Sequence, residues 1–456
     1  MANLAQGIDA LALLPTDERI KALQRVLPRS QVDEVLAETG HDKDFCKRLP
    51  GWFVVWFVVG IGLFCKDSYR QIYRWLQVFQ PGGIPGRSTL CEARKRLGSR
   101  PLLALIKRVV CLLGTPLTPG AFYRDMRLMS VDGFVLDVAD TPANEKAFGR
   151  PKGGRGRGAF PQVRVLALCE TGSHVIWRFL IKSISRSENS MLAYLTRFLE
   201  SNMLLLWDRG FLSYKAVCDV LARKAHLLIR IKSDRIFEPI LFFSDGSFLS
   251  KIYPSKVDRL HDRNGIIVRI IEYTYTDPAL PDSGKKHRLL TTLLDPELDP
   301  AKTIICLYHE RWEEELAFDE IKTHQRERPV LRSQTPAGVI QEILGLFLGH
   351  YAIRVLMQNA AETVQIDPQR ISFTATLKIL RCRLPEIQKN QSRKNLEGWY
   401  QKLVQEVAEE VLAPRRHRIN PRVIKVKMSK WPKKQPAHRA FPQPSKPFVQ
   451  ALAMLH

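Results

Sequence analysis

The chain has 456 residues, enough for several compact units, and 45% of them are hydrophobic, which is ordinary for a soluble globular protein. Its charge is unusual, because 70 Lys and Arg stand against 46 Asp and Glu, a formal net charge of +24. Such a surplus attracts polyanions, so nucleic acid is the first partner to consider, with a merely basic soluble protein as the alternative. The eight cysteines form no CxxC pair and no Cys/His cluster, which argues against a structural zinc site or a disulfide framework and fits a reducing cytoplasm.

Residues 1–125 are predicted to form a helical N-terminal domain. Apolar residues recur at helical spacing in segments 20–27 and 68–76. The apolar run 51–65 is shorter than the about 20 residues that a membrane-spanning helix needs, so we expect a buried core helix and no membrane partner.

A glycine- and proline-rich turn at residues 81–86 precedes a short basic helix. We expect a capping box at 89–92 to open this helix and Gly98 to end it. The helix carries three candidate DNA contacts: Arg94, Lys95 and Arg96. A helix, a turn and a basic helix outline a helix-turn-helix reader, although a basic helix facing solvent remains an equal alternative.

From residue 126 the pattern becomes strand-like, with apolar stretches at 127–138, 162–168 and 175–181. The glycine-rich loop 149–158 has no acidic residue, and its Arg155 and Arg157 are candidate contacts to DNA phosphates. A flexible basic loop without a partner is the alternative.

The order of the predicted elements indicates an α/β core interrupted by a β-rich insertion. The chain divides into five expected segments: a DNA-binding helical domain 1–125, a first core part 126–221, a β-rich insertion 222–300, a second core part 301–380, and a basic C-terminal region 381–456. The last segment is expected to be extended and to serve DNA contact or dimerisation, with a solvated disordered tail as the alternative.

Two aspartates follow apolar strand patterns. Asp132 comes after the run at 127–131, and Asp208 comes directly after the continuously apolar run 203–207, which is typical of a strand buried on both faces. If the two strands are parallel and adjacent, both carboxylates emerge at the same edge of the sheet. Carboxylates are the ligands that hard divalent cations need, and two such cations can catalyse phosphodiester cleavage. Either aspartate alone could equally be a turn residue.

A third acid is expected on a helix that spans residues 308–322. At 100° per residue, Tyr308, Arg311, Glu315 and Lys322 share one face about 60° wide. Asp319 shares this face and competes with Glu315 as the acid. The alternative is a helix that carries only ion pairs between residues four apart.

These residues resemble conserved elements of the insertion sequence 4 family of transposases. The pattern Tyr308-x2-Arg311-x3-Glu315-x6-Lys322 is similar to that family's Y-R-E-K element. The segments 130–133 with 140–149, and 207–211, look like the regions of its first and second catalytic aspartates. The resemblance covers nearly the whole chain, including a helical domain before the core.

The resemblance implies an RNase H-like core that binds two Mg²⁺ ions, for which Mn²⁺ would substitute. The implied metal ligands and catalytic residues are Asp132, Asp208 and Glu315. The implied DNA contacts near the cleaved bond are Tyr308, Arg311 and Lys322. Arg209, which follows Asp208, is a further candidate DNA contact.

The activity implied is that of a DDE transposase, which cleaves DNA at terminal inverted repeats and joins the freed 3′-hydroxyl groups to target DNA. The expected partners are double-stranded DNA and a second copy of the chain, in the bacterial cytoplasm at the nucleoid. Two rivals remain: a nuclease or resolvase with the same core but no strand transfer, and a catalytically silent DNA-binding protein.

One departure from the family concerns the β-rich insertion. Some members stack a flipped base on a Trp there while forming a hairpin intermediate, but residues 209–311 contain no Trp. Five other aromatic residues could stack a base instead: Phe242, Phe243, Tyr253, Tyr273 and Tyr275. The hairpin route is left open.

Overall fold

The computed structural model describes residues 27–42, 49–76, 83–153, 156–232, 235–278, 283–384, 393–414 and 446–454. The chain divides into two compact units. The first unit comprises residues 1–121, 133–187 and 314–413, and the second comprises residues 122–132, 188–313 and 414–456.

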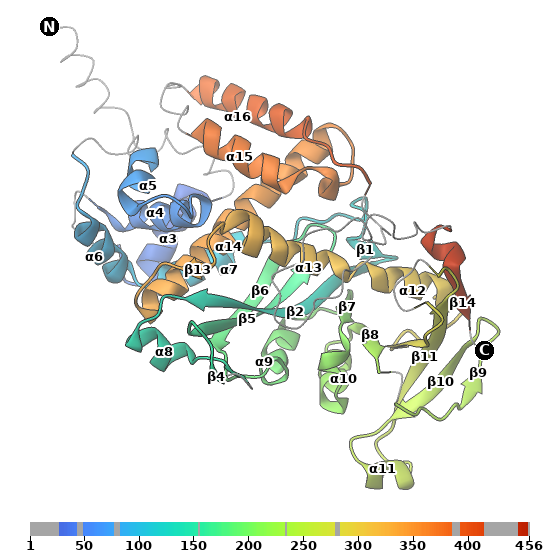
Figure 1. Cartoon of the computed structure of the whole chain (residues 1–456). Helices are drawn as coiled ribbons and strands as arrows, with labels where there is room; N and C mark the ends of the chain where they lie inside the picture. The colour runs from blue at the N-terminus through green and yellow to red at the C-terminus, as the bar shows by residue number, and fades with distance from the viewer. Residues whose placement is uncertain are drawn as a thin grey trace, which may run out of the picture. The chain divides into compact units, whose positions relative to one another are not determined.

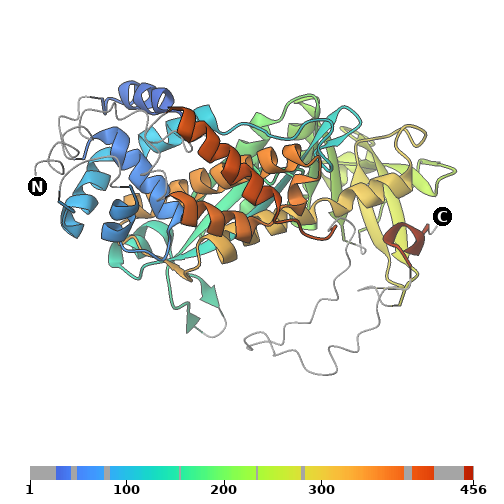
Figure 2. The ribbon, with the colours of Figure 1, turned by 90° about the horizontal axis from the view of Figure 1, so that it is seen from above.

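The first unit is mainly helical. Its helices and strands are α3 (Arg29–Glu38), α4 (Gly51–Leu63), α5 (Tyr69–Leu76), α6 (Arg87–Leu97), α7 (Arg100–Val109), α8 (Pro142–Phe148), β3 (Lys152–Gly153), β4 (Gly156–Arg157), β5 (Gln162–Glu170), β6 (Ile176–Ser183), most of α13 (Trp312–Asp319), η5 (Glu320–Gln325), β13 (Val330–Leu331), α14 (Pro336–Thr363), η6 (Pro368–Arg370), α15 (Phe373–Arg383) and α16 (Arg393–Ala408). The helices α14, α15 and α16 lie side by side, orange in Figures 1 and 2.

The core of the first unit is the crossing of α4 and α14. In α4 every residue except Trp52 is buried, which confirms that the apolar run 51–65 forms a core helix. A Cβ atom on Gly62 would lie only 2.1 Å from the carbonyl oxygen of Gly345, so glycine is required for this close approach. Within the described part of the chain, α14 is the one helix long and apolar enough to cross a membrane, and 89% of its most apolar window is buried.

The second unit is built on a mixed sheet. Its elements are β1 (Phe122–Tyr123), α9 (Glu188–Leu195), η3 (Thr196–Phe198), β7 (Met203–Trp207), η4 (Arg209–Phe211), α10 (Tyr214–Leu221), β8 (His226–Ile231), β9 (Leu241–Phe242), β10 (Ser247–Ile252), α11 (Lys256–Leu260), β11 (Ile266–Tyr275), β12 (His287–Thr291), α12 (Ala301–His309), η8 (Phe448–Ala451) and β14 (Leu452–Met454). The strand β2 (Met126–Val138) contributes its first half to this unit and its second half to the first unit.

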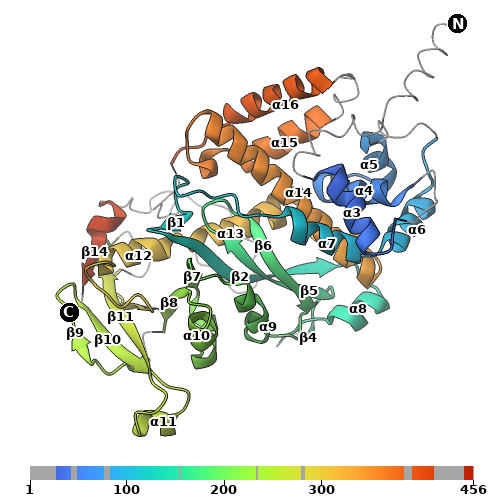
Figure 3. The same cartoon turned by 180° about the vertical axis from the view of Figure 1, so that it is seen from behind.

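The strand order in the second unit is β2-β7-β8-β12-β11-β10-β9. The pairs β2–β7 and β7–β8 are parallel, and all pairs from β8 onward are antiparallel. All five residues of β7 are buried, as expected for a central strand covered on both faces. The antiparallel part confirms a β-rich region after β8, and Figure 3 shows α11 at the far end of the β10–β11 hairpin.

The end of the chain corrects one expectation. Instead of remaining unpacked, residues 452–454 form β14, which pairs antiparallel with β11, and Leu452 is buried in the hydrophobic core of the second unit. The backbone hydrogen bonds to β11 and the burial of Leu452 hold residues 452–454 in place. Neither interaction can be read from the sequence of the tail, because both need the strand β11 of the folded insertion. The basic residues between 415 and 445 lie outside the described residues.

Two local expectations are also corrected. The helix α6 begins at Arg87 without a side-chain cap, so the predicted capping box at 89–92 does not form, although Gly98 ends the helix with a φ of 63° as expected. The glycine-rich stretch predicted to be a loop contains a short antiparallel hairpin, in which Lys152 pairs with Arg157 and Gly153 with Gly156.

Candidate active site

The two aspartates extend neighbouring parallel strands in the second unit. The register of β2 and β7 ends with the pair Val131 and Trp207, so the next residue on each strand is Asp132 and Asp208. The backbone of Asp208 is still extended, with φ −85° and ψ 160°, and both side chains are half-buried. Paired residues on adjacent strands point to the same face of a sheet, so the two carboxylates lie side by side.

The position of Asp132 differs from the expectation in one respect. It does not end its strand, because β2 continues to Val138. The continuation is held within the first unit, where β13 pairs in parallel with β2 at Asp137 and Val138. The pairing of β2 with β7 ends at Val131, directly before Asp132, whereas the strand itself continues.

The segment 308–322 is not one continuous α-helix, so the prediction of one regular helix over these residues is wrong. The helix α12 ends at His309, a turn follows at 310–311, α13 runs from Trp312 to Asp319, and residues 320–325 form a π-helical turn. Glu310 and Arg311 form i→i−3 backbone hydrogen bonds, which tighten the chain at the break. Tyr308 and Arg311 therefore belong to the second unit, whereas Glu315 and Lys322 belong to the first.

Tyr308 supports the backbone beside Asp208. Its buried hydroxyl donates a hydrogen bond of 3.0 Å to the carbonyl oxygen of Trp207, the residue directly before Asp208. Burial, together with the negative charge of Asp208, raises the pKa of Tyr308 to about 12 although Arg311 opposes the shift. The hydroxyl thus stays protonated as a donor at neutral pH, and it fixes the end of β7 rather than facing solvent.

Arg311 is also buried, which differs from the phosphate contact that the resemblance implied. Its guanidinium lies 5.9 Å from the ring centre of Tyr308 and 4.8 Å from that of Trp312. Aromatic rings are favourable partners for a guanidinium at these distances. In this structure Arg311 packs beneath the site instead of presenting its charge to solvent.

The remaining predicted site residues, two acids and two cations, differ in how far their side chains are exposed to solvent. Glu315 is half-buried on α13, whereas the competing Asp319 is exposed and is held by its own helix, since it accepts a 2.5 Å hydrogen bond from Thr323 and lies 3.3 Å from His324. Arg209 and Lys322 are exposed and can reach an external anion.

Among the three basic residues of α6, only two face solvent. Lys95 and Arg96 are exposed, and Lys95 pairs with Glu92 at 2.6 Å. Arg94 is buried and donates hydrogen bonds to Gln341 at 3.2 Å and to the carbonyl oxygen of Gly338 at 2.9 Å. Its prediction as a DNA contact is therefore wrong, because it joins α6 to α14 inside the first unit.

The side chains of the two predicted DNA contacts in the glycine-rich stretch are not described by the structure. Arg155 lies outside the described residues, and for Arg157 only the backbone in β4 is described. Among the aromatic residues considered for base stacking, Phe242 is the most exposed and Tyr273 is buried, so Tyr273 cannot receive a base.

An ion pair in the insertion, which the sequence analysis missed, holds the start of α12. The Asp245 carboxylate accepts a 2.9 Å hydrogen bond from the backbone N–H of Ala301 and pairs with Arg269, which is fully buried and donates to the carbonyl oxygen of Asp299 at 2.6 Å. Burial alone would raise the pKa of Asp245, but hydrogen bonds from Ser247 and Ala301 and the charge of Arg269 lower it. A single Arg within the apolar run 266–271 was the signal, because a charge in a buried strand needs a partner.

The two aspartates of the second unit fit a divalent cation by their chemistry. Asp132 and Asp208 supply adjacent carboxylate oxygens, which hard cations prefer. Across the described ranges, however, no three His, Cys, Asp or Glu side chains are grouped so that they could hold a metal ion. Glu315 belongs to the other unit.

Comparison with known proteins agrees with this architecture over most of the chain. Residues 17–107 match the family described as insertion element 4 transposase N-terminal, and residues 123–406 match the family described as transposase DDE domain. The chain is 29% identical over 414 residues to the transposase InsG for insertion sequence element IS4 of Escherichia coli K12, covering 88% of this chain and 91% of that protein.

More distant similarities extend to two further proteins. The putative transposase InsZ of Escherichia coli K12 is 24% identical over 192 residues, which cover 41% of this chain and 62% of that protein. A solved piggyBac transposase synaptic complex with hairpin DNA gives a TM-score of 0.43 at 11% identity, covering 87% of this chain and 85% of the other.

Proposed function

Because this chain belongs to the insertion sequence 4 family of DDE transposases, metal-dependent enzymes that act on DNA, we propose that Asp132, Asp208 and Glu315 are its catalytic metal ligands. The mixed α/β architecture is that of the family's RNase H-like core. The observation that carries the proposal is the register of β2 and β7, which ends at the pair Val131 and Trp207, directly before Asp132 and Asp208. Glu315 is proposed as the third ligand from its place in the Y-R-E-K pattern.

The proposed reaction is hydrolysis of phosphodiester bonds at the element's terminal inverted repeats, followed by attack of the freed 3′-hydroxyl groups on target DNA. Two bound Mg²⁺ ions would supply stabilisation of the attacking and leaving oxygens. The three carboxylates would hold the ions, and the hydrogen bond from Tyr308 to the carbonyl oxygen of Trp207 would keep Asp208 at the end of β7.

Exposed cations are proposed to contact the DNA backbone. Arg209 directly follows Asp208, and Lys322 follows Glu315 on the next part of the helical segment, so each exposed cation is near a proposed ligand in the sequence. Lys95 and Arg96 are proposed contacts of the N-terminal domain, and Arg157 remains a proposed contact of the β3–β4 hairpin. Charge-assisted bonds to phosphate position DNA without reading its sequence.

We further propose that two copies of the chain act together, each holding one transposon end, and that the bound protein is found at the nucleoid. Sedimentation of the protein with and without end DNA tests the first part. A complex of two chains and two DNA ends is expected, and a complex with one chain would contradict it.

The experiment that tests the function is cleavage and strand transfer of labelled end DNA in Mg²⁺, Mn²⁺ or EDTA. We expect metal-dependent cleavage and joining to a plasmid by the wild type, and loss of both to the EDTA background in Asp208→Asn. Asp219→Asn is the matched control, since this acid of the same unit pairs with the exposed Lys215 one helical turn away on α10, and its loss should leave the rate unchanged.

Each rival predicts a different result. Cleavage without joining would favour a nuclease or resolvase, and tight binding without cleavage by the wild type would favour a silent DNA-binding protein. Persistent metal-dependent cleavage in Asp208→Asn would sink the assignment of the site.

A further inference from the structure

The helix that carries Glu315 passes directly into a π-helical turn at residues 320–325. Such turns hold well under 1% of residues in globular proteins and are frequently found at functional sites. A π turn contains one more residue than an α turn, so it changes the direction of the side chains that follow its start. The turn carries the exposed Lys322, and its first residue, Glu320, lies just over one helical turn after Glu315.

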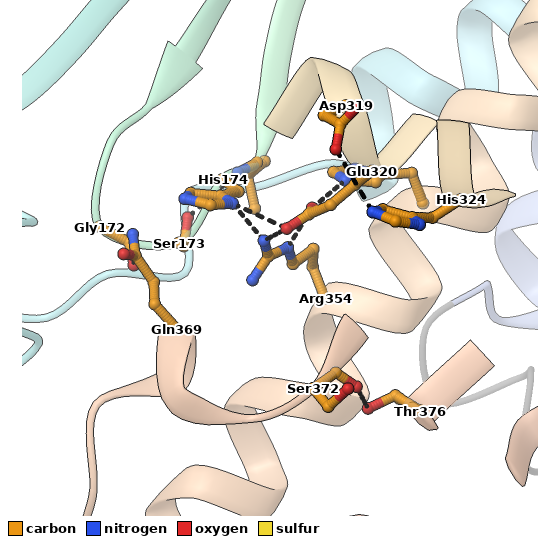
Figure 4. Close-up of polar contacts among 12 residues, drawn as sticks. Gly172, Ser173, His174, Asp319, Glu320, His324, Arg354, Gln369, Ser372 and Thr376 are labelled. Carbon is orange, nitrogen blue, oxygen red and sulfur yellow. Dashed lines mark hydrogen bonds and ion pairs between the residues drawn. The ribbon is translucent and has the colours of Figure 1, made fainter. Parts of the chain in front are cut away.

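The first residue of the π turn is held by a buried charged cluster in the first unit (Figure 4). The Glu320 carboxylate lies 2.9 Å from His350 Nε2, 3.0 Å from His174 Nδ1 and 3.0 Å from Arg354 Nε, with a second contact to the Arg354 guanidinium. All four side chains are buried. His174 comes from the turn between β5 and β6, whereas His350 and Arg354 lie one helical turn apart on α14. Glu320 therefore ties the π turn to two separate elements.

The last residue of the π turn is held as well. The buried Gln325 side chain donates hydrogen bonds of 3.0 Å to the carbonyl oxygen of Gly62 and 2.9 Å to that of Leu346. These carbonyls belong to α4 and α14, at the glycine crossing that forms the core of the unit. Both ends of the turn are thus attached by side chains to the most buried helices of the first unit.

A buried ion pair is poor evidence for stability alone, because desolvation offsets much of the attraction between the charges. Its better-supported use is to specify one arrangement among several of similar energy. Here the arrangement specified is the π turn, since in a regular α-helix through 320–325 Gln325 would be turned away from its partners when Glu320 keeps its own. The cluster therefore determines where the helical segment is anchored relative to α14.

We propose that Glu320 is a positioning residue for catalysis, which acts through Arg354, His174 and His350 to fix the helical segment that carries Glu315 and Lys322. This inference rests on the proposed function of Glu315 as a metal ligand. Glu320 itself is too deeply buried to touch DNA or metal. Residues that orient metal ligands typically change metal affinity or activity by about 10- to 100-fold when they are replaced.

The test separates positioning from folding. Glu320→Gln alone would leave Arg354 with a buried, uncompensated charge, so the variant to measure is the double replacement Glu320→Gln with Arg354→Gln, which is neutral. Folding is checked by circular dichroism and by binding of end DNA in EDTA. In the complex with DNA we expect Mn²⁺ affinity, measured by calorimetry, and the cleavage rate at saturating DNA each to fall about tenfold or more.

Glu342→Gln is the matched control. Glu342 is a buried acid on the same helix α14, and it accepts hydrogen bonds from Ser333 at 2.7 and 3.0 Å without touching the π turn. We expect this variant to lose stability but to keep Mn²⁺ affinity. A folded double variant with Mn²⁺ affinity no lower than that of Glu342→Gln would overturn the inference.

Measuring Mn²⁺ affinity in Glu315→Ala tests the proposed metal site separately from the positioning role of Glu320. If Glu315→Ala binds Mn²⁺ as the wild type does, Glu315 is not a ligand and the proposed site fails, whatever the result at Glu320. If Glu315→Ala loses Mn²⁺ affinity while the double variant retains it, the site stands and the positioning role of Glu320 is refuted.

Discussion

Two buried arginines hold the beginning and the end of the helical segment 301–325, each in a different unit. In the second unit, Arg269 pairs with Asp245, whose carboxylate also accepts from the first N–H of α12. In the first unit, Arg354 pairs with Glu320 at the π turn. The chemistry of the two ion pairs is the same, but their surroundings differ.

The difference lies in solvent and in the supporting hydrogen bonds. The Asp245 side chain is 21% exposed and receives backbone N–H groups from Ser247 and Ala301. The Glu320 side chain is 7% exposed, and the contacts that hold its carboxylate come from side chains, two of them imidazoles. The first pair is supported by backbone that forms with the strand and helix themselves, whereas the second depends on charges brought together from distant parts of the chain.

The largest expected effect follows from removing each arginine. Arg354→Met should lower the free energy of unfolding by about 3–5 kcal/mol, because a buried carboxylate loses its charged partner. Arg269→Met should cost less than Arg354→Met, since Asp245 keeps backbone hydrogen bonds and contact with solvent. Chemical denaturation, monitored by hydrogen exchange of peptides from each unit, measures the loss of unfolding free energy in both variants. An equal or larger loss for Arg269→Met would contradict the comparison.

The second largest expected effect is a difference between the two units in the pH at which each ion-pair region loses stability. Burial, with the positive charge of Arg354, lowers the pKa of His350, although Glu320 opposes the shift. A histidine whose pKa is depressed by folding contributes stability above its unfolded pKa of about 6.5, and this contribution is lost as the pH falls. Burial alone would raise the pKa of Glu320, but Arg354 and His174 hold it well below its usual range, so its contribution is lost only below about pH 4.5.

In the second unit, by contrast, the lowered pKa of Asp245 leaves that ion pair intact until the pH falls below about 4. Hydrogen exchange between pH 7 and pH 5 should therefore show peptides around 320–325 losing protection before those around 301–305. His350→Gln should remove this early loss. Simultaneous loss in both places would contradict the assignment to His350.

The smallest expected loss of stability follows from replacing Tyr308, which supports the end of β7. Tyr308→Phe removes one hydrogen bond to the carbonyl oxygen of Trp207 and should cost about 0.5–1.5 kcal/mol of stability, with a several-fold slower cleavage of end DNA. Tyr253→Phe is the control, because it removes a hydroxyl that bonds to Asp262 on the insertion surface. Equal cleavage rates in the two variants would show that Tyr308 does not support Asp208.

Sequence reasoning reached the strands and the two aspartates because their signals are local. The uninterrupted apolar run before Asp208 marks a buried central strand, and the parallel pairing of β2 with β7 confirms the expected adjacency. The same reasoning failed at 308–322, where a regular helix was assumed and the chain has a break and a π turn. The division into five segments, and the roles of the site residues, stay predictions.

The sequence by itself determined the class of protein and marked Asp132 and Asp208 as acids that follow apolar strand patterns, because strand pattern and family motifs are properties of short stretches of chain. The tertiary structure decided that these two strands pair in parallel. Only the tertiary structure decided that Arg94 is buried, that the chain's last strand joins β11, and that the helix after Glu315 becomes a π turn. Each of these depends on partners more than a hundred residues away in sequence, such as Gly62 for Gln325, and no local pattern encodes which distant group will be there.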